Sequence, residues 1–151
     1  MELKHTNHAV RQSAYHFVWR PKYNVPVFAR KYPRQVAREA ILEIAAKHKI
    51  EILELKVMPN HVHCFAQLPA TISVSLALQI LKGGSARLFF KKCTIWYAFF
   101  SKDGREKPHL WSPGKFFRSV GSVTSETVEA YIKYSQDEWS FEFKGIKRRA
   151  L

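Results

Sequence analysis

Two histidines one residue apart, His61 and His63, are the residues whose type and spacing most directly suggest chemistry. They follow Pro59 and Asn60, which favour a turn, and residues 61–68 are predicted to form a strand. Side chains alternate along a strand, so both imidazoles would point to the same face of the sheet. Neutral imidazole is a common ligand for divalent ions, so the pair is a candidate for part of a metal site.

Two imidazoles do not complete such a site, and the remaining ligands must come from elsewhere in the fold. The alternative is that both histidines are partly exposed strand residues whose partners are water and backbone groups. As residues near the surface they would contribute little to the core, so we expect alanine at either position to leave folding nearly intact. His16, on another predicted strand, could face the same site, although a structural role is the simpler interpretation.

The elements that must position the histidines follow from the spacing of apolar residues. Strands are predicted over 13–20, 50–57, 61–68, 93–100 and 115–120. The strand over 50–57 contains a possible bulge, and the Pro59-Asn60 turn joins it to the histidine strand as a hairpin. Several strands linked by short turns predict a sheet that is largely antiparallel.

Amphipathic helices are predicted over 34–47, 73–92 and about 124–139. Gly83 and Gly84 interrupt the second helix, which predicts a kink there or a close approach by another backbone. Gly121 and Ser122 break the pattern before the third helix, and the tail over 144–151 is basic. This order of elements predicts an α+β fold, an antiparallel-rich sheet with helices packed on it.

The length and composition describe a single domain. A chain of 151 residues that is 46% hydrophobic is enough for one core, so we expect one domain over 1–151. No apolar run approaches the length of a membrane span, and the start lacks a signal-peptide pattern. The two cysteines, Cys64 and Cys93, are too few for a disulfide framework. We therefore expect a cytoplasmic protein that has no membrane partner.

The charge is the strongest signal in the composition, because 25 Lys+Arg against 12 Asp+Glu give a formal net charge of +13. This excess indicates a polyanionic partner, and nucleic acid is the first candidate. Aromatic residues make up 14% of the chain, and single strands are often held in basic grooves with aromatic platforms. The alternative is a basic protein whose aromatic side chains are in its core. The candidate phosphate contacts are Arg20, Lys22, Arg30, Lys82, Arg87 and Lys91.

The last predicted helix carries Tyr131, Tyr134, Ser135 and Gln136. A tyrosine hydroxyl can act as a covalent nucleophile. Together with a metal site and a large positive charge, it suggests phosphoryl transfer on nucleic acid, in which the metal polarises the scissile phosphate and the tyrosine attacks in line. Because the pKa of tyrosine is ordinarily near 10, the metal or basic neighbours would have to assist the attack.

These features together resemble the HUH-type single-tyrosine transposases of the insertion sequence 200/605 group. The resemblance runs from about residue 15 to residue 136 and is most specific in a histidine–hydrophobe–histidine motif followed by a helical tyrosine. The matching segments are 20–23 (RPKY), 55–63 (LKVMPNHVH), 81–83 (LKG), 110–112 (LWS), 120–121 (VG), 127–128 (TV) and 131–132 (YI).

The resemblance implies a ferredoxin-like sandwich similar to replication initiators, acting as a homodimer on single-stranded DNA. It implies a DNA transposase that cleaves and rejoins element ends marked by hairpins, with Mg²⁺ or Mn²⁺ as cofactor. His61 and His63 would be metal ligands and Tyr131 the nucleophile, on a mobile helix hinged near Gly121.

A glutamine on the tyrosine helix completes the metal site in that family. The family pattern places it four residues after the tyrosine, where this chain has Ser135 and the glutamine comes one residue later, at Gln136. Gln136 would share the face of Tyr131 if a one-residue π-bulge realigned the helix. Otherwise the ion would keep an additional water molecule, or the element would be defective.

Two other functions remain compatible with the sequence. One is a non-catalytic protein that binds single-stranded nucleic acid and keeps the fold and the charge. The other is a related nicking enzyme that serves replication or a domesticated role. A metal-dependent covalent adduct with DNA separates the enzymes from the binding protein, and joining of element ends separates the transposase from the nicking enzyme.

Overall fold

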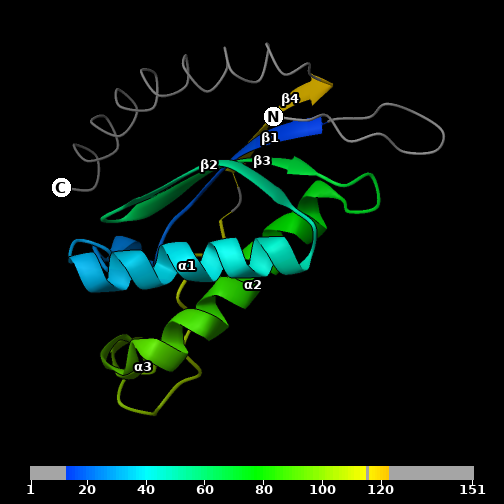
Figure 1. Ribbon diagram of the computed structural model, residues 1–151. Coiled ribbons are helices and arrows are strands. Elements are labelled where there is room, and N and C mark those ends of the chain that lie inside the picture. The colour runs from blue at the N-terminus through cyan, green and yellow to red at the C-terminus, as the bar shows by residue number, and fades with distance from the viewer. Residues whose placement is uncertain (1–12, 115, 123–151) are drawn as a thin grey trace.

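The computed structural model describes residues 13–114 and 116–122, which form a four-stranded sheet with helices against it (Figure 1). The strands are β1 (Ser13–Trp19), β2 (Glu51–Met58), β3 (His61–Leu68) and β4 (Phe116–Ser122). Their order in the sheet is β2-β3-β1-β4, and every neighbouring pair is antiparallel. The predicted α+β class is therefore confirmed, with the histidine strand β3 inside the sheet rather than at its edge.

Three α-helices and a short 3-10 helix complete the described part of the chain. They are η1 (Lys22–Asn24), α1 (Lys31–Lys47), α2 (Val74–Lys92) and α3 (Thr94–Phe100). Helices α1 and α2 pack against each other on one side of the sheet, and α3 follows at the far end of α2 (Figure 1). Within the described residues, no helix has the length and apolar character needed to cross a membrane.

The core lies between the sheet and helices α1 and α2. The even-numbered side chains of β3 belong to it, since alternate side chains of a strand share a face. They pack with Phe17 and Trp19 of β1 and with the buried stripes of the two helices. The odd-numbered side chains of β3, which include both histidines, therefore point to the opposite face of the sheet.

The predicted hairpin and bulge are both present. Met58 pairs with His61 across the two-residue turn, so β2 and β3 form the expected hairpin. The register shifts between Ile52 and Glu54, which leaves Leu53 as the extra residue of a bulge.

The two adjacent glycines of α2 have different surroundings, and the helix continues through both of them. A Cβ on Gly84 would overlap the side chain of Ile44, so glycine lets α1 and α2 approach closely. A Cβ on Gly83 would meet nothing within 4 Å. The predicted close approach exists at Gly84, although it is made by a side chain of α1, and the helix is not interrupted.

The segment over 93–100 was predicted as a strand, and that prediction was wrong, because Thr94–Phe100 form helix α3. The segment is rich in β-branched and aromatic residues, which favour strands mainly where neighbouring strands can pack beside them. Here the rings of Tyr97 and Phe100 pack on Phe90 of α2, with centroids 5.6 Å and 6.1 Å away. Tertiary packing on α2 therefore outweighs the intrinsic β preference of the segment.

The predicted break at Gly121 and Ser122 was also wrong, because both residues belong to β4. Gly121 pairs with Ala14, and Ser122 pairs with Ser13 of β1. The register shifts just before them, since Tyr15 pairs with Ser119 while Ala14 pairs with Gly121. A bulge at residue 120 thus lets the strand continue to Ser122. The predicted helix over 124–139 and the basic tail over 144–151 lie outside the described residues.

Candidate active site

His61 and His63 lie side by side along β3 on the face of the sheet away from α1 and α2, as their spacing predicts. Both are buried, with exposed fractions of 0% and 3%. The alternative of two partly exposed histidines on the strand is therefore wrong. Buried imidazoles need hydrogen-bond partners or a bound cation, so the surroundings of each ring decide what it can do.

His16 of β1 is a direct partner of His63. Nε2 of His16 lies 3.1 Å from Nδ1 of His63, and the ring centroids are 3.9 Å apart. The pairing of Val18 with His63 places the two rings on the same face of neighbouring strands. The sequence analysis allowed His16 to face this site but favoured a structural role for it. The alternation over 13–20 had placed His16 on the face of the sheet opposite Phe17 and Trp19.

Asn60 engages the other histidine. Its side-chain Oδ1 lies 3.2 Å from Nδ1 of His61, and because the amide oxygen only accepts, His61 donates from Nδ1. That tautomer places the lone pair of the ring on Nε2, the atom that would bind a metal. Burial, and to a smaller extent the nearby charge of Arg20, lowers the pKa of His61 to about 4. His61 is therefore neutral at pH 7, the form that ligates a divalent cation.

Arg20 supplies positive charge beside the histidines. Its guanidinium donates to Asn24 Oδ1 at 3.4 Å, a long hydrogen bond within the segment that follows β1. Partial burial lowers the pKa of Arg20 from its usual value, yet arginine stays charged at any pH that a folded protein experiences. A fixed cation beside the neutral imidazole of His61 favours an anionic group such as a phosphodiester at this face.

The donor set fits a divalent cation only in part. Two imidazoles share one face, but among the described residues no group of three or more His, Cys, Asp or Glu could hold a metal ion. A third protein ligand would have to be another residue type or come from another part of the chain. Tyr131 and Gln136, the predicted nucleophile and third ligand, both lie outside the described ranges.

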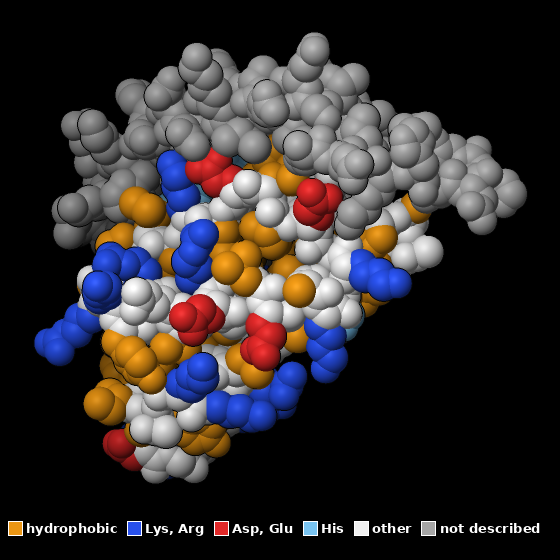
Figure 2. Space-filling model, viewed as in Figure 1, with side chains coloured by type: hydrophobic (Ala, Val, Ile, Leu, Met, Phe, Trp, Pro, Cys, Tyr) orange, Lys and Arg blue, Asp and Glu red, His pale blue; other side chains and the backbone are white. Residues whose placement is uncertain are grey.

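The predicted phosphate contacts separate into several places. Arg20 lies near the histidines, and Arg30 lines a pocket of about 590 Å³ together with Tyr32 and residues of α3. Arg87 and Lys91 are exposed on α2. Figure 2 shows Lys and Arg side chains at several separate positions on one face, with hydrophobic side chains between them.

Three of the six predicted phosphate contacts line one pocket, whose volume is about 700 Å³: Lys22, Lys82 and Arg87. Lys107 also lines it. Lys107 belongs to a segment that was predicted only as a polar connector. A single lysine in such a segment did not indicate that it would line a pocket. Lys82 donates to the carbonyl oxygens of Ser112 and Gly114, at 2.7 Å and 3.1 Å. These hydrogen bonds connect α2 to the segment over 112–114, on the other side of the pocket.

Comparison with known proteins gives a consistent picture. A family model described as "Transposase IS200 like" matches residues 9–135. The ISDra2 transposase TnpA of Deinococcus radiodurans is 27% identical over 138 residues, which are 91% of this chain and 94% of that protein. The transposase for insertion sequence element IS200 of Salmonella typhimurium is 30% identical over 135 residues, or 84% of each chain.

Solved structures share the fold. A crystal structure from Deinococcus radiodurans R1 superposes with a TM-score of 0.66 at 22% identity, covering 89% of this chain and 96% of that one. A REP-associated tyrosine transposase bound to a REP hairpin gives a TM-score of 0.54 at 16% identity, over 89% of this chain and 70% of that one. At these identities the likeness supports the sheet-with-helices architecture described above.

Proposed function

Because the chain belongs to the IS200-like transposase family, we propose that it cleaves and rejoins single-stranded DNA at hairpin-marked ends through a metal-assisted phosphotyrosine intermediate. The observation that carries this proposal is the pair of histidines on one face of β3, with Nδ1 of His61 at Asn60 and Nδ1 of His63 at His16. Each ring thus has its Nδ1 occupied by a neighbour, which favours Nε2 as the ligating atom of both.

His61 and His63 would hold Mg²⁺ or Mn²⁺, and Gln136 is the proposed third protein ligand. The ion, when bound, would neutralise charge on the scissile phosphate and polarise its phosphorus. Arg20 adds a permanent positive charge at the same face, which favours binding of the phosphodiester. The neutral state of His61, which follows from its burial, keeps this ligand available at pH 7.

Tyr131 is the proposed nucleophile. Its oxygen would form a bond to phosphorus while the bond from phosphorus to one sugar oxygen breaks, and the released strand end takes up the proton as a hydroxyl. The hydroxyl of a second DNA end can then attack the phosphotyrosine and displace the tyrosine, which joins two strands without an external energy source. This exchange accounts for both cleavage and rejoining.

The partners follow from charge and from the relatives. A net charge of +13 suits a DNA substrate, and one structural neighbour is a transposase bound to a hairpin. We propose hairpin-bearing single strands as the substrate and a homodimer as the active form. A hairpin substrate would present both duplex phosphates and unpaired nucleotides to the protein.

A covalent-adduct assay tests the proposal. The purified protein is incubated with hairpin-bearing single-stranded ends from the flanks of its own gene, with Mg²⁺ or with a chelator, and the products are separated under denaturing conditions. We expect a protein–DNA adduct and joined strands only when the metal is present. Tight binding without any adduct would instead indicate a non-catalytic binding protein, and an adduct without joined strands would indicate a nicking enzyme.

A further inference from the structure

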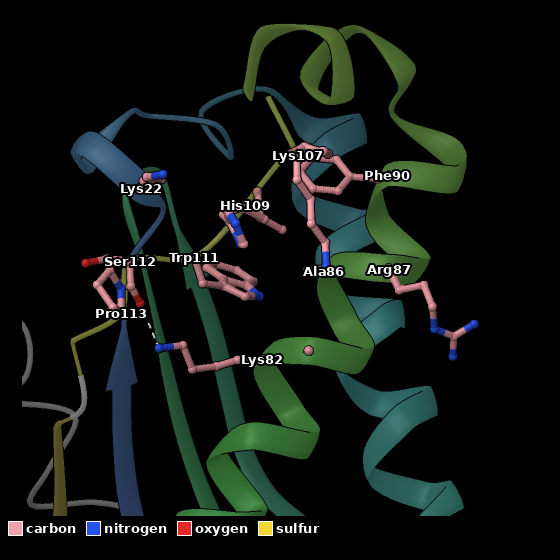
Figure 3. Close-up of a pocket in the computed structure, with 13 residues that line it drawn as sticks. Lys22, Lys82, Ala86, Arg87, Phe90, Lys107, His109, Trp111, Ser112 and Pro113 are labelled. Atoms are coloured by element: carbon pink, nitrogen blue, oxygen red, sulfur yellow. Dashed lines mark hydrogen bonds between the residues drawn. The ribbon is translucent and has the colours of Figure 1, made fainter. Parts of the chain in front are cut away.

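The pocket of about 700 Å³ lies on the helix side of the sheet, away from the face that carries the histidines. One wall is the second half of α2, and the other is the segment over 107–113 (Figure 3). Backbone hydrogen bonds fix this segment to the end of β1, since Lys22 donates to Leu110 O at 2.8 Å and Ser112 donates to Arg20 O at 2.8 Å. Pro21 and Trp111 form an isolated antiparallel bridge between the same segments. The pocket therefore has ordered walls.

The positive charge of the side chains that line the pocket favours an anionic ligand. Lys22, Lys82, Arg87 and Lys107 line it, and none of its described lining residues is acidic. In Figure 3, Lys107 extends from its segment toward α2, whereas Arg87 extends away from Trp111. Lys82 is directed at the carbonyl oxygens of the opposite wall. The ammonium of Lys22 lies over the ring of Tyr23, 5.2 Å from its centroid. Lys107 is thus the cation best placed to contact a bound phosphate.

The inner surface of the pocket is aromatic. Trp111 is almost fully buried and is held edge-on to Trp19, with ring centroids 5.9 Å apart. Its indole N–H donates to Ser85 Oγ at 3.0 Å, so its orientation is fixed. Phe90 lines the pocket from α2 and is half-buried. The pocket therefore has a cationic part and an aromatic part. A nucleotide, which carries a flat base and a phosphate, is complementary to both.

Gly83 keeps this pocket open. Glycine in the middle of a helix costs about 1 kcal/mol relative to alanine. At Gly84 the close approach of Ile44 explains why glycine is present despite this cost. At Gly83 a Cβ would meet nothing within 4 Å. Packing within the described structure therefore gives no reason for glycine at position 83. A ligand that approaches the helix backbone closely from the pocket would give one.

We propose that this pocket binds one unpaired nucleotide of the DNA, with its phosphate at Lys107 and its base against Phe90 and Trp111. The inference rests on DNA being the substrate and adds a binding position remote from the chemistry. A volume of about 700 Å³ falls within the range of small-ligand sites and is too small for a duplex. The pocket should therefore contribute to affinity for single strands and leave the phosphoryl-transfer step unchanged.

Fluorescence anisotropy with an unstructured oligothymidine and with hairpin-bearing DNA tests this site. Gly83→Leu places a side chain into the pocket without a clash in the helix, so the variant should fold and bind the single strand at least about tenfold more weakly, comparable to the loss of one base stack. Lys107→Gln, at an exposed loop position, should lower the log–log salt slope by about 0.7. Lys47→Gln on α1 removes the same charge from an exposed residue that does not line the pocket, so it should leave affinity unchanged. A binding constant for Gly83→Leu equal to that of the unchanged protein would overturn the proposal.

The adduct assay separates this proposal from the proposed function. At saturating hairpin DNA, Gly83→Leu should form the adduct at the rate of the unchanged protein. If no adduct forms with any variant but Gly83→Leu and Lys107→Gln still weaken single-strand binding, the pocket stands and the enzymatic function fails. If the adduct forms normally and both variants bind like the unchanged protein, the function stands and the pocket proposal fails.

Discussion

Nε2 of His16 lies 3.1 Å from Nδ1 of His63, so the imidazole on β1 restricts the tautomer of the imidazole on β3. Both rings are buried, and a hydrogen bond between them needs one nitrogen to donate and the other to accept. Only the arrangement in which His63 donates leaves the lone pair of His63 on Nε2, where it can bind a cation. His16 thus acts as a positioning residue for a proposed metal ligand.

Replacing His16 by Phe should weaken binding of Mn²⁺ by roughly 10- to 100-fold, as losses of residues that orient metal ligands typically do. Phe preserves the size of the ring and removes the hydrogen bond. Isothermal titration calorimetry with Mn²⁺ measures the change. His48→Phe is the matched control, because His48 lies at the end of α1 and is hydrogen bonded to Ile44 O. Equal Mn²⁺ affinity in the two variants would show that His16 does not position His63.

The burial of His61 and His63 changes what their replacement should do. Alanine at either position removes a buried ring, so we expect a loss of about 2–5 kcal/mol in unfolding free energy rather than the intact fold that a surface position would predict. Urea unfolding measures this loss. His63→Gln, which preserves more of the volume, should bind hairpin DNA normally and form no adduct with Mg²⁺. Full cleavage by His63→Gln would show that His63 is not a ligand of the catalytic metal ion.

Tyr131 rather than Tyr134 should form the phosphotyrosine bond. Tyr131 precedes Ile132 and follows Thr127 and Val128 at the spacing of the family resemblance. Phe keeps the ring and removes the hydroxyl, so Tyr131→Phe should abolish the adduct while Tyr134→Phe retains it. Gel separation of labelled DNA after denaturation distinguishes the two, and the reverse pattern would assign the reaction to Tyr134.

The lowered pKa of His61 makes stability depend on pH. Its pKa is about 4 in the folded protein against 6.5 when unfolded, so between these values the unfolded chain binds more protons. The contribution of His61 to unfolding free energy should therefore rise with pH from about 4 to 6.5 and then level off. The total change is about 3 kcal/mol at most, since each pKa unit corresponds to roughly 1.4 kcal/mol.

Urea unfolding at several pH values, with a chelator present, measures this dependence. His61→Asn removes the titrating ring, so the difference between the unchanged protein and this variant isolates its contribution. The difference should be larger at pH 7 than at pH 4. A difference that stays constant over this range would mean that His61 titrates alike in both states.

The two adjacent glycines of α2 should respond to alanine in opposite directions. Gly83→Ala should raise unfolding free energy by up to about 1 kcal/mol, because its Cβ enters open space and alanine is the better helix former. Gly84→Ala should lower it by about 1–3 kcal/mol, because its Cβ overlaps Ile44. Thermal unfolding measures both. Ile44→Ala removes the two overlapping atoms, Cγ1 and Cδ1, so it should cost less unfolding free energy beside Gly84→Ala than it costs alone. Equal costs in the two backgrounds would indicate that the clash is relieved elsewhere.

Local pattern predicted the elements whose signals depend on neighbours in the chain. The alternation over 61–68 placed His61 and His63 on one face, and Pro59 and Asn60 predicted the hairpin. The same kind of signal failed over 93–100, where β-branched and aromatic residues suggested a strand. A high strand propensity stabilises a strand only where another strand can pair with it. This segment instead packs on α2 through Tyr97 and Phe100 and is helical.

The charge pattern predicted the class of partner but not where the cations meet. Lys22, Lys82, Arg87 and Lys107 come from three separate segments, and only the folded chain brings them to one pocket. Lys82 also showed a role that charge alone could not indicate, since it donates to backbone carbonyl groups across the pocket.

Periodicity and net charge are local or additive properties, so the α+β class, the shared face of the two histidines and the expectation of a polyanionic partner could be predicted without the structure. The burial of the histidines, the contact of His16 with His63 and the need for glycine at position 84 rather than 83 are visible only in the folded chain. These depend on the register of β1 against β3 and of α1 against α2, which brings together residues 47 and 40 positions apart in the chain. Contacts of that kind arise from the packing of whole elements, and no local pattern encodes them.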